Sequence, residues 1–405
     1  MKVDVGELGA RAEKMIATLA PISSEPGRLV RLFLSPEHRR AADQVTQWMK
    51  KAGLTVSEDA LGTLRGRMGE GKRLLIGSHL DSVIDGGNYD GPLGVIAGVL
   101  AAQYAKEKGL PVAIDVLAFG DEEGSRFPST LSSSSASAGN FDPAVLKLTD
   151  RTGISFAEAV KNYGKNTADI GKDAYRKGEA TAYVEVHIEQ GPRLEAANEP
   201  LGVVTGIVGQ SRFRVTVTGE AGHAGTVPMD MRRDALAGAA EMALAAEKLA
   251  GTHKDMVATV GRFEALPGAT NIIPGRVLFT VDLRCMEDHE RESAVAQFEE
   301  RARKISAGRK LDVAFEHFHD VSATACDARL QDLLDAAIRD FGHKPERMPS
   351  GAGHDGQEMA RVCPVAMMFV RCRGGISHNP AEYASPSDMG TAIAALIRFV
   401  ERFAG

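Results

Sequence analysis

A strand–helix–strand run near residue 75 constrains the fold of this chain most strongly. The apolar segment RLLIGSH (73–79) predicts a short strand, and GVIAGVLAAQYAKE (94–107) predicts a helix. VAIDVLAFGDEEG (112–124) predicts a buried strand that ends in an acidic loop. Strands that alternate with helices in this order pair in parallel, and their ligand sites lie beyond the carboxyl ends of the strands. The sequence therefore predicts an α/β fold with a mostly parallel sheet.

The pattern changes near residue 209. SRFRVTVTG (211–219) alternates between apolar and polar residues, as a half-exposed strand does, and residues 234–250 form a strongly amphipathic helical segment. Further strands are predicted at 256–265 and 275–285, and a second helix at 290–307. Two helices among about four alternating strands predict a self-contained layer of helices on an antiparallel sheet, which is an α+β arrangement.

Apolar strand character returns after about residue 325. PVAMMFVRC (364–372) predicts a buried strand, and a helix at 387–403 closes the chain. We therefore predict a discontinuous catalytic domain, 1–208 and 325–405, with residues 209–324 inserted as a lid. A length of 405 residues is enough for two domains.

Composition excludes several classes of protein. The net charge of −6 comes without any basic run, so neither nucleic acid nor an anionic membrane is an expected partner. No segment approaches the roughly 18 apolar residues of a membrane span, and the N-terminus lacks the apolar core of a signal peptide. The four cysteines lack Cys-x-x-Cys spacing and are expected to be buried, idle thiols. A cytoplasmic protein is expected.

Five segments place possible metal ligands at the ends of predicted strands or in loops. A lone histidine in such a loop is more often a surface or hydrogen-bonding residue. All five segments, however, follow an apolar run and then Gly, Ser or Asp turn chemistry, so we expect them to gather on one rim of the sheet. They are GSHLDSV (His79, Asp81), NYDGPLGV (Asp90), FGDEEGSRF (Asp121, Glu122, Glu123), VEVHIEQGP (His187, Glu189, Gln190) and GGISHNP (His378).

Imidazoles together with carboxylates suit Zn, Mn, Co or Fe, whereas Ca and Mg prefer shells made of oxygen alone. Two divalent ions about 3.5–4 Å apart need a shared carboxylate to offset their repulsion. Asp90 is a natural bridge because it lies on a turn just before a helix. Asp81, two residues after His79, is placed to accept the second imidazole N–H and so fix the tautomer of a ligating histidine.

The adjacent acids Glu122 and Glu123 suggest hydrolytic chemistry. Side chains of consecutive residues in an extended segment point to opposite sides, so one carboxylate can bind metal while the other faces a water molecule that the metal activates. That second carboxylate can take a proton from the water and pass it to a leaving nitrogen. Standing alone, the DEEG segment would more simply be a solvated acidic turn.

The predicted lid carries a second set of polar residues. His223 lies in a Gly-rich turn, Asn271 in GATNIIPG and Arg284 in VDLRC. A histidine and an asparagine can stabilise an oxyanion, and an arginine can hold a carboxylate through two parallel hydrogen bonds. Each residue alone would more often be a capping or surface residue, but as a set they suggest a substrate-binding face.

Read together in order, these segments closely resemble the M20 metallopeptidase family. Within it, His187 in HIEQGP resembles the amidohydrolase branch that holds β-ureidopropionases, N-carbamoyl-L-amino-acid hydrolases and allantoate amidohydrolases, whereas the peptidases usually have an acid there. The resemblance extends from about Gly77 to Glu382. It implies two divalent ions, Zn or Mn, and Glu122 as general base. The implied ligands are His79, Asp90 and His187 for one ion, and Asp90, Glu123 and His378 for the other.

The resemblance also implies a homodimer formed through the lid, with His223 and Asn271 reaching the site of the neighbouring subunit. Gln190 and Arg284 match positions that hold the substrate, Arg284 through its carboxylate. The segment SGAGHDGQE matches another family loop, which places Gly353, His354 and Asp355 near the pocket.

The residues of these motifs are most similar to those of allantoate amidohydrolases. The expected function is therefore the hydrolysis of a ureido acid, with allantoate as the first candidate substrate. Ammonia and carbon dioxide are expected products. N-carbamoyl-L-amino-acid hydrolase and β-ureidopropionase remain alternatives, followed by an aminoacylase or dipeptidase and by a non-catalytic binding protein. The chain departs from the family pattern at one place: members commonly carry Gly-Ser-Arg or Gly-Ser-Lys where this chain has Ser133, Ser134 and Ser135.

Overall fold

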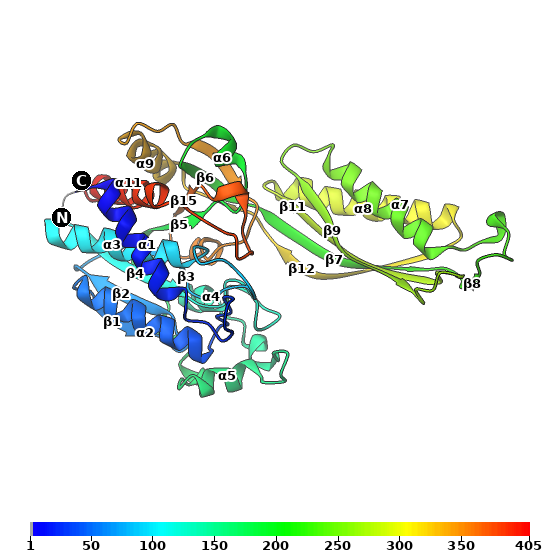
Figure 1. The fold of residues 1–405 in the computed structure, drawn as a ribbon, viewed down its shortest axis with the longest axis horizontal. Coiled ribbons are helices and arrows are strands. Elements are labelled where there is room, and N and C mark those ends of the chain that lie inside the picture. The colour runs from blue at the N-terminus through cyan, green and yellow to red at the C-terminus, as the bar shows by residue number, and fades with distance from the viewer. Residues whose placement is uncertain (1–2) are drawn as a thin grey trace. The chain divides into compact units, whose positions relative to one another are not determined.

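The computed structural model describes residues 3–405, which divide into two units (Figure 1). The larger unit comprises Met1–Gly206 and Ala325–Gly405, and the smaller unit comprises Ile207–Thr324. The chain thus leaves the larger unit two residues before the predicted boundary and re-enters it at the predicted residue.

A nine-stranded mixed sheet forms the centre of the larger unit. Its order is β1-β2-β4-β3-β5-β15-β6-β13, and β14 pairs with β6. The four central strands, β4, β3, β5 and β15, run parallel, while β1 pairs antiparallel with β2, β2 with β4, and β6 with β15. The strands are β1 (Thr55–Glu58), β2 (Leu64–Met68), β3 (Arg73–His79), β4 (Ala113–Phe119), β5 (Ala180–Ile188), β6 (Leu201–Ile207), β13 (Thr324–Ala325), β14 (Glu346–Ser350) and β15 (Val365–Val370).

Side chains from both faces of this sheet are buried. In β3, Leu74 and Ile76 pack into a core with the helices on one face, and Leu75 between them packs into a second core on the other face. A parallel sheet covered on both sides needs near-continuous apolar strands, which is why RLLIGSH and PVAMMFVRC lack polar alternation.

Helices and short 3₁₀ turns cover the sheet of the larger unit. The helix predicted at 94–107 is α3, which packs on β3, β4 and β5, and α11 packs on α1, α3 and α9, so the N-terminal and closing helices lie together (Figure 1). The helices are α1 (Val5–Leu19), α2 (Pro36–Lys51), α3 (Pro92–Lys108), α4 (Ser132–Ser137), α5 (Phe156–Asn162), α6 (Arg193–Ala197), α9 (Ala328–Arg339), α10 (Gly356–Met359) and α11 (Pro386–Ala404); the 3₁₀ turns are η1 (Pro143–Lys147), η2 (Thr167–Asp169) and η4 (Arg373–Gly375).

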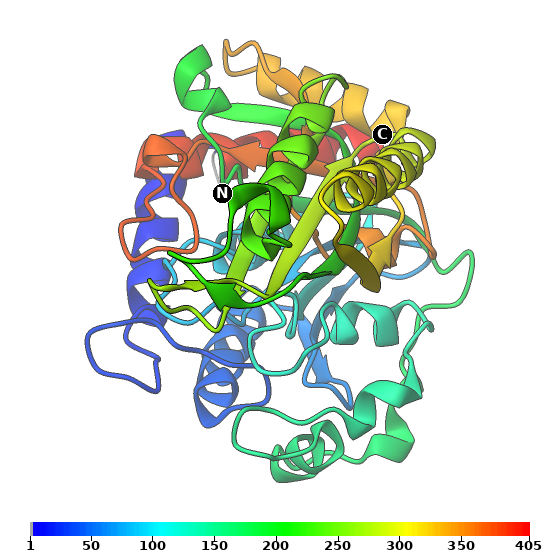
Figure 2. The ribbon, with the colours of Figure 1, turned by 90° about the vertical axis from the view of Figure 1, so that its right-hand side faces the viewer.

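The smaller unit is a four-stranded antiparallel sheet, in the order β12-β7-β11-β9, with two helices on one face. Figure 2 shows these helices, α7 and α8, side by side over the strands. A two-stranded ribbon of β8 and β10 completes the unit. Its elements are β7 (Gly209–Thr218), β8 (Gly222–His223), η3 (Met229–Met231), α7 (Ala235–Ala250), β9 (Val257–Leu266), β10 (Ile272–Ile273), β11 (Arg276–Cys285), α8 (Asp288–Gly308) and β12 (Asp312–Val321).

Alternation in the strands of the smaller unit sets which face the helices cover. Phe213, Val215 and Val217 of β7 are fully buried against α7 and α8, while the residues between them are partly exposed. The α+β arrangement predicted from the sequence is therefore present.

All four cysteines are buried free thiols, as expected. Within the described part of the chain, no helix combines the length and the apolar character that crossing a membrane requires.

Candidate metal centre

Four parallel strands bring the predicted site residues to one edge of the larger sheet. His79 ends β3, and its register partner Phe119 ends β4 just before Glu122 and Glu123. His187 is the second-last residue of β5, and its register partner Phe369 is on β15, which leads to the loop of His378. Because carboxyl ends of parallel strands share an edge, the predicted gathering on one rim is confirmed.

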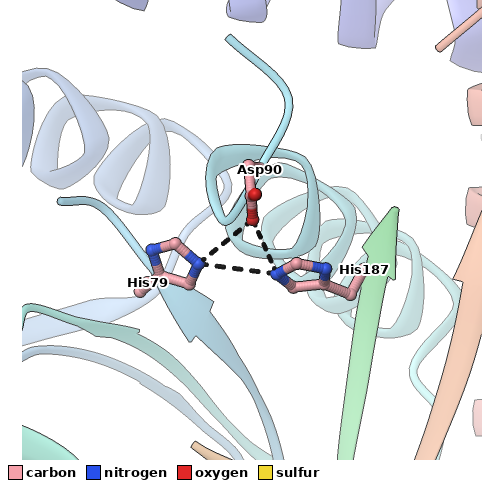
Figure 3. Close-up of side chains that lie close together, drawn as sticks. All are labelled: His79, Asp90 and His187. Atoms are coloured by element: carbon pink, nitrogen blue, oxygen red, sulfur yellow. Dashed lines mark hydrogen bonds and ion pairs between the residues drawn. The ribbon is translucent and has the colours of Figure 1, made fainter. Parts of the chain in front are cut away.

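Three buried side chains form the first donor set, drawn in Figure 3. Nε2 of His187 lies 3.0 Å from Oδ1 of Asp90, Nε2 of His79 lies 3.5 Å from the same oxygen, and the two Nε2 atoms are 3.4 Å apart. Tetrahedral coordination with metal–nitrogen bonds of about 2.0 Å places neighbouring ligand atoms about 3.3 Å apart. The spacing of the three atoms therefore fits a divalent ion.

The tautomers of the two histidines show how this set can hold a cation. Nδ1 of His79 is 3.2 Å from the backbone oxygen of Asp81, and Nδ1 of His187 is 2.9 Å from the backbone oxygen of Ile188. A carbonyl oxygen only accepts, so in the neutral ring Nδ1 carries the hydrogen and Nε2 carries the lone pair. When both rings are neutral, two lone pairs and a carboxylate oxygen face one another, and either protons on the two Nε2 atoms or a bound cation offset the repulsion.

A second donor set shares Asp90 with the first. Nε2 of His378 lies 3.5 Å from Oδ2 of Asp90 and 3.4 Å from Oε2 of Glu123. Asp90 thus turns one carboxylate oxygen toward each set, which is the arrangement of a bridging ligand. The His378 side chain is 51% exposed, whereas Asp90 is 7% exposed, so the second set faces solvent on one side.

Gln190 lies within the second donor set. Its Nε2 donates to Oδ2 of Asp90 over 2.7 Å and lies 3.5 Å from Nε2 of His378. The amide is neutral, but its N–H groups carry partial positive charge, and one of them is directed at the Asp90 carboxylate. Gln190, for which the family resemblance implies a role in substrate binding, is therefore within reach of anything held at this set.

The Asp81 carboxylate supports both donor sets. Its Oδ1 lies 3.4 Å from Nδ1 of His79, as predicted for a residue that fixes the tautomer. It also accepts hydrogen bonds from the backbone N–H groups of Glu122, over 3.3 Å, and of Glu123, over 3.2 Å. One buried carboxylate thus orients a histidine and anchors the backbone of the acidic loop.

The prediction that Glu122 and Glu123 extend to opposite sides of a strand is wrong. The chain bends after β4 because Asp121 adopts a left-handed conformation with φ of 62°. Ligand atoms of both glutamates consequently lie within 4.8 Å of each other and of His79. Each still meets a different set: Oε2 of Glu122 is 3.9 Å from Nε2 of His79, and Glu123 contacts His378.

Burial and mutual repulsion raise the pKa of several acids in the cluster. Burial, together with the charge of Asp90, raises the pKa of Glu123 to about 8, and burial is also the main cause that raises the pKa of Glu122 well above its usual value. Burial lowers the pKa of His79, but the charges of Glu122, Asp81 and Asp90 outweigh it and raise that pKa well above 6.5. The cluster thus holds more negative charge than its surroundings stabilise, a condition that divalent cations relieve.

Strained backbone marks the same region. Besides Asp121, Gln190 and His378 adopt positive φ angles of 57° and 54°. Gly91, which follows Asp90, has φ of 82°, and a Cβ there would lie 2.5 Å from the His79 ring. Such conformations persist where surrounding structure imposes them, often at functional sites. Here they allow loops to approach His79 closely.

The loop after β14 lies beside His187. The ring of His354 meets that of His187 edge-on, with centroids 4.5 Å apart, and its Nε2 is 2.8 Å from the hydroxyl oxygen of Ser350. The backbone N–H of Gly356 donates to Glu185 on β5. Gly353, which precedes His354, is half-buried. The predicted proximity of this loop to the site is therefore present.

The predicted residues of the smaller unit do not form one cluster within it. His223 pairs with Ile272 in the β8–β10 ribbon, next to Asn271, and both predicted residues are exposed. Arg284 lies near the other end of β11, eight residues beyond its first residue Arg276, or about 26 Å at the rise of an extended strand. The prediction that these three residues form a single substrate-binding face is thus wrong within one copy of the unit. Arg284 instead donates through Nε and Nη2 to Asp282.

Two features at this edge were not assigned from the sequence. Glu382, buried four residues after His378, accepts hydrogen bonds from the backbone of Asp90 and its neighbour. The sequence signal that could have identified Glu382 is an acidic residue in the same loop as a proposed ligand.

The hydroxyl of Ser133 accepts a hydrogen bond from the N–H of Gly120 over 2.9 Å and donates one to the carbonyl oxygen of Gly120. The serine-rich segment, α4, thus stabilises the chain at the end of β4.

The model of Peptidase family M20/M25/M40 matches residues 75–402, which include both donor sets. The chain belongs to this family. It is 41% identical to a probable allantoate deiminase from Oryza sativa subsp. japonica, over 95% of this chain and 86% of that protein. It is 40% identical to an N-carbamoyl-L-amino acid amidohydrolase from Geobacillus stearothermophilus, over 98% of each.

A solved structure agrees with this membership. The fold matches an amidase of the hydantoinase/carbamoylase family from Burkholderia multivorans with a TM-score of 0.91 and 33% identity, over 98% of each chain. A match of this extent includes both units. The resemblance to the M20 family and the predicted fold class are thus confirmed.

Proposed function

We propose that this protein is a two-metal amidohydrolase that hydrolyses the carbamoyl group of a ureido acid, with allantoate as the first candidate substrate and N-carbamoyl-L-amino acids as the alternative. Relatives named for these two activities match the chain almost equally, at 41% and 40% identity. The reaction converts R–NH–CO–NH₂ and water into R–NH₂, carbon dioxide and ammonia.

The observation that carries this proposal is the position of Asp90 between the two donor sets. One oxygen faces His79 and His187, and the other faces His378, as a carboxylate shared by two ions requires. Nitrogen and carboxylate donors of this kind favour Zn or Mn over Ca.

Glu122 is the proposed general base. A pair of divalent ions supplies Lewis acidity, which lowers the pKa of water and polarises a carbonyl group. The Glu122 carboxylate, 3.9 Å from His79, lies beside the first donor set and is placed to take a proton from water and deliver it to the leaving nitrogen. Burial raises the pKa of Glu122, as is common for acids that carry protons at active sites.

Chain groups around the donor sets hold these parts in place. Asp81 fixes the ring of His79 and the backbone of Glu122. We assign Gln190, which lies beside the second donor set, to the substrate. We also assign Arg284, a residue of the smaller unit, to the carboxylate of the substrate, because a guanidinium binds carboxylates through two parallel bonds.

We further propose that the smaller unit is a lid through which two copies associate. Its edge strand β9 carries exposed apolar residues, among them Val257 at 55%, and Leu244 of α7 is 66% exposed. An unprotected apolar edge favours pairing with another chain. His223 and Asn271 would then serve the site of the partner copy, in keeping with their separation from Arg284 along the smaller unit.

A substrate panel tests the reaction. Purified protein reconstituted with Zn²⁺ or Mn²⁺ is assayed for ammonia release from allantoate, N-carbamoyl-β-alanine and several N-carbamoyl-L-amino acids. Release from at least one of them is expected. Cleavage of acyl amino acids or dipeptides without ammonia would instead indicate an aminoacylase or dipeptidase, and a metal-loaded protein inert toward every substrate would indicate a binding protein.

Subunit complementation tests the lid. His223→Ala and Glu122→Gln are each expected to be nearly inactive, whereas a mixture refolded or expressed together should regain activity, because a mixed dimer holds one site with both side chains intact. Sedimentation velocity gives the oligomeric state, and Val257→Lys is expected to shift it toward the monomer. A wild-type protein that sediments as a monomer would refute the lid proposal alone.

A further inference from the structure

Glu382 links the loop of one donor set to the turn that carries Asp90. Its side chain is 4% exposed. Its Oε1 accepts hydrogen bonds from the backbone N–H of Tyr89, over 2.9 Å, and from the backbone N–H of Asp90, over 3.1 Å. These residues are 292 or more positions apart in the chain, so only the folded protein holds this turn against the His378 loop.

Ser377, next to His378, holds the side chain of the same aspartate. Its hydroxyl donates to Oδ2 of Asp90 over 2.9 Å, and Oε2 of Glu382 lies 3.4 Å from that hydroxyl. A hydroxyl has one hydrogen, and the shorter contact is the one to Asp90. Glu382 therefore fixes the backbone of Asp90 while Ser377 fixes one of its oxygens.

Gly87 makes room for this arrangement. A Cβ at Gly87 would lie 2.3 Å from Cβ, Cδ and Oε1 of Glu382, and its φ is not in the left-handed region. Alanine would therefore suit the backbone of Gly87, but its methyl group would displace the Glu382 carboxylate. The Asp90 turn and the Glu382 side chain are thus fitted to each other.

We propose that Glu382 is a positioning residue for the shared ligand: it holds the backbone at Tyr89 and Asp90 so that the two oxygens of Asp90 face the two donor sets at once. This inference rests on the proposed two-metal function. Because Asp90 belongs to both sets, loss of its support weakens binding of both ions. Removing a group that orients a ligand typically weakens metal binding by about 10–100-fold.

Three variants and one control separate positioning from charge and from general damage. Glu382→Ala removes the acceptor and should weaken Zn²⁺ binding by about 10–100-fold. Glu382→Gln keeps a side-chain oxygen for the two N–H groups and should bind Zn²⁺ almost as the wild type does. Gly87→Ala should weaken binding by displacing Glu382, whereas its control, Gly86→Ala, meets a Val83 methyl rather than Glu382 and should not.

A double variant tests whether Gly87 acts through Glu382. Glu382→Gly removes the three atoms nearest to a Cβ at residue 87, so adding Gly87→Ala to it should cause no further loss of Zn²⁺ affinity. Additive losses would mean that the methyl group disturbs the turn by another route, and they would contradict the fitted arrangement.

The measurement is titration of the metal-free protein with Zn²⁺ against a competing chelator, with bound metal counted by mass spectrometry and folding checked by circular dichroism. Wild-type affinity and stoichiometry in folded Glu382→Ala would overturn the positioning role. Failure of the wild type to bind two ions would overturn the metal centre itself. A wild type that binds two ions but hydrolyses no substrate would contradict the proposed reaction and leave this inference standing.

Discussion

The Asp90 side chain contacts the histidines of both donor sets. It is buried, it accepts hydrogen bonds from Gln190 and Ser377 through Oδ2, and its Oδ1 faces two imidazole nitrogens. Burial raises its pKa, but the adjacent His187 and His79 outweigh burial and hold the pKa of Asp90 well below its usual value. The residue is thus an anion at neutral pH, as a ligand shared by two cations must be.

Glu122→Gln tests the general base at the same scale. The amide keeps the size of the side chain but cannot take a proton, so kcat should fall by about 10²–10⁴-fold. Glu122 is not among the proposed ligands, so bound metal should stay at the wild-type amount. Ammonia release and metal counting measure the two quantities.

Retention of most activity in Glu122→Gln would assign the proton transfer to another group. Loss of bound metal together with activity would instead place Glu122 among the ligands. Asp81→Asn is the companion variant, since it should weaken metal binding by about 10–100-fold through the orientation of His79.

Close helix contacts fix the larger unit at the scale of its elements. Where α1 crosses α11, a Cβ at Gly9 would lie 2.0 Å from the backbone oxygen of Pro386, and a Cβ at Gly390 would lie 2.1 Å from that of Val5. The two helices therefore touch through their backbones, and this contact joins the first and last helices of the chain. Similar contact occurs where α3, which begins just after Asp90, meets the sheet: a Cβ at Gly94 would lie 2.2 Å from the Val186 oxygen.

Gly9→Ala should separate α1 from α11 and lower the free energy of unfolding by about 1–3 kcal/mol, the usual cost of overpacking. Gly6→Ala on the same helix is the matched control. Gly6 is exposed, and its added Cβ would come no closer than 3.4 Å to another atom, so helix propensity should raise stability by up to about 1 kcal/mol. Urea unfolding compares them, and equal effects would contradict a backbone contact at Gly9.

At the scale of the whole molecule, each unit has its own apolar core. Both proposed ion sites lie in the larger unit, and so do the single tryptophan, Trp48, and all six tyrosines. Indole fluorescence therefore reports on the larger unit alone, whereas circular dichroism reports on both.

Removal of metal should destabilise only the unit that binds it. A ligand present at 100 times its Kd stabilises the folded state by about 2.7 kcal/mol, so chelation should lower the fluorescence-detected Tm. A second transition seen by circular dichroism should keep its Tm. Readdition of Zn²⁺ is the control, and a fluorescence Tm that chelation leaves unchanged would contradict metal binding by the larger unit.

The sequence by itself determined the elements and the convergence of the site. The strand at 73–79 was predicted to the residue, and α3 and α11 to within two residues, because unbroken apolar runs and helical periodicity are local signals. Parallel strands carry the residues at their carboxyl ends to one edge, so the order of the elements was enough to bring His79, His187 and His378 together.

Only the tertiary structure decided how these parts are held. The bend at Asp121 depends on Asp81, whose carboxylate accepts the N–H groups that follow, and no local pattern reports a bond 41 residues away. The bonds from Tyr89 and Asp90 to Glu382 join residues that are 293 and 292 positions apart in the chain. The same holds for the separation of His223 from Arg284, since strand pairing rather than composition sets distances along a sheet. Periodicity specifies which residues face a core, whereas contacts between distant segments exist only once the cores have formed.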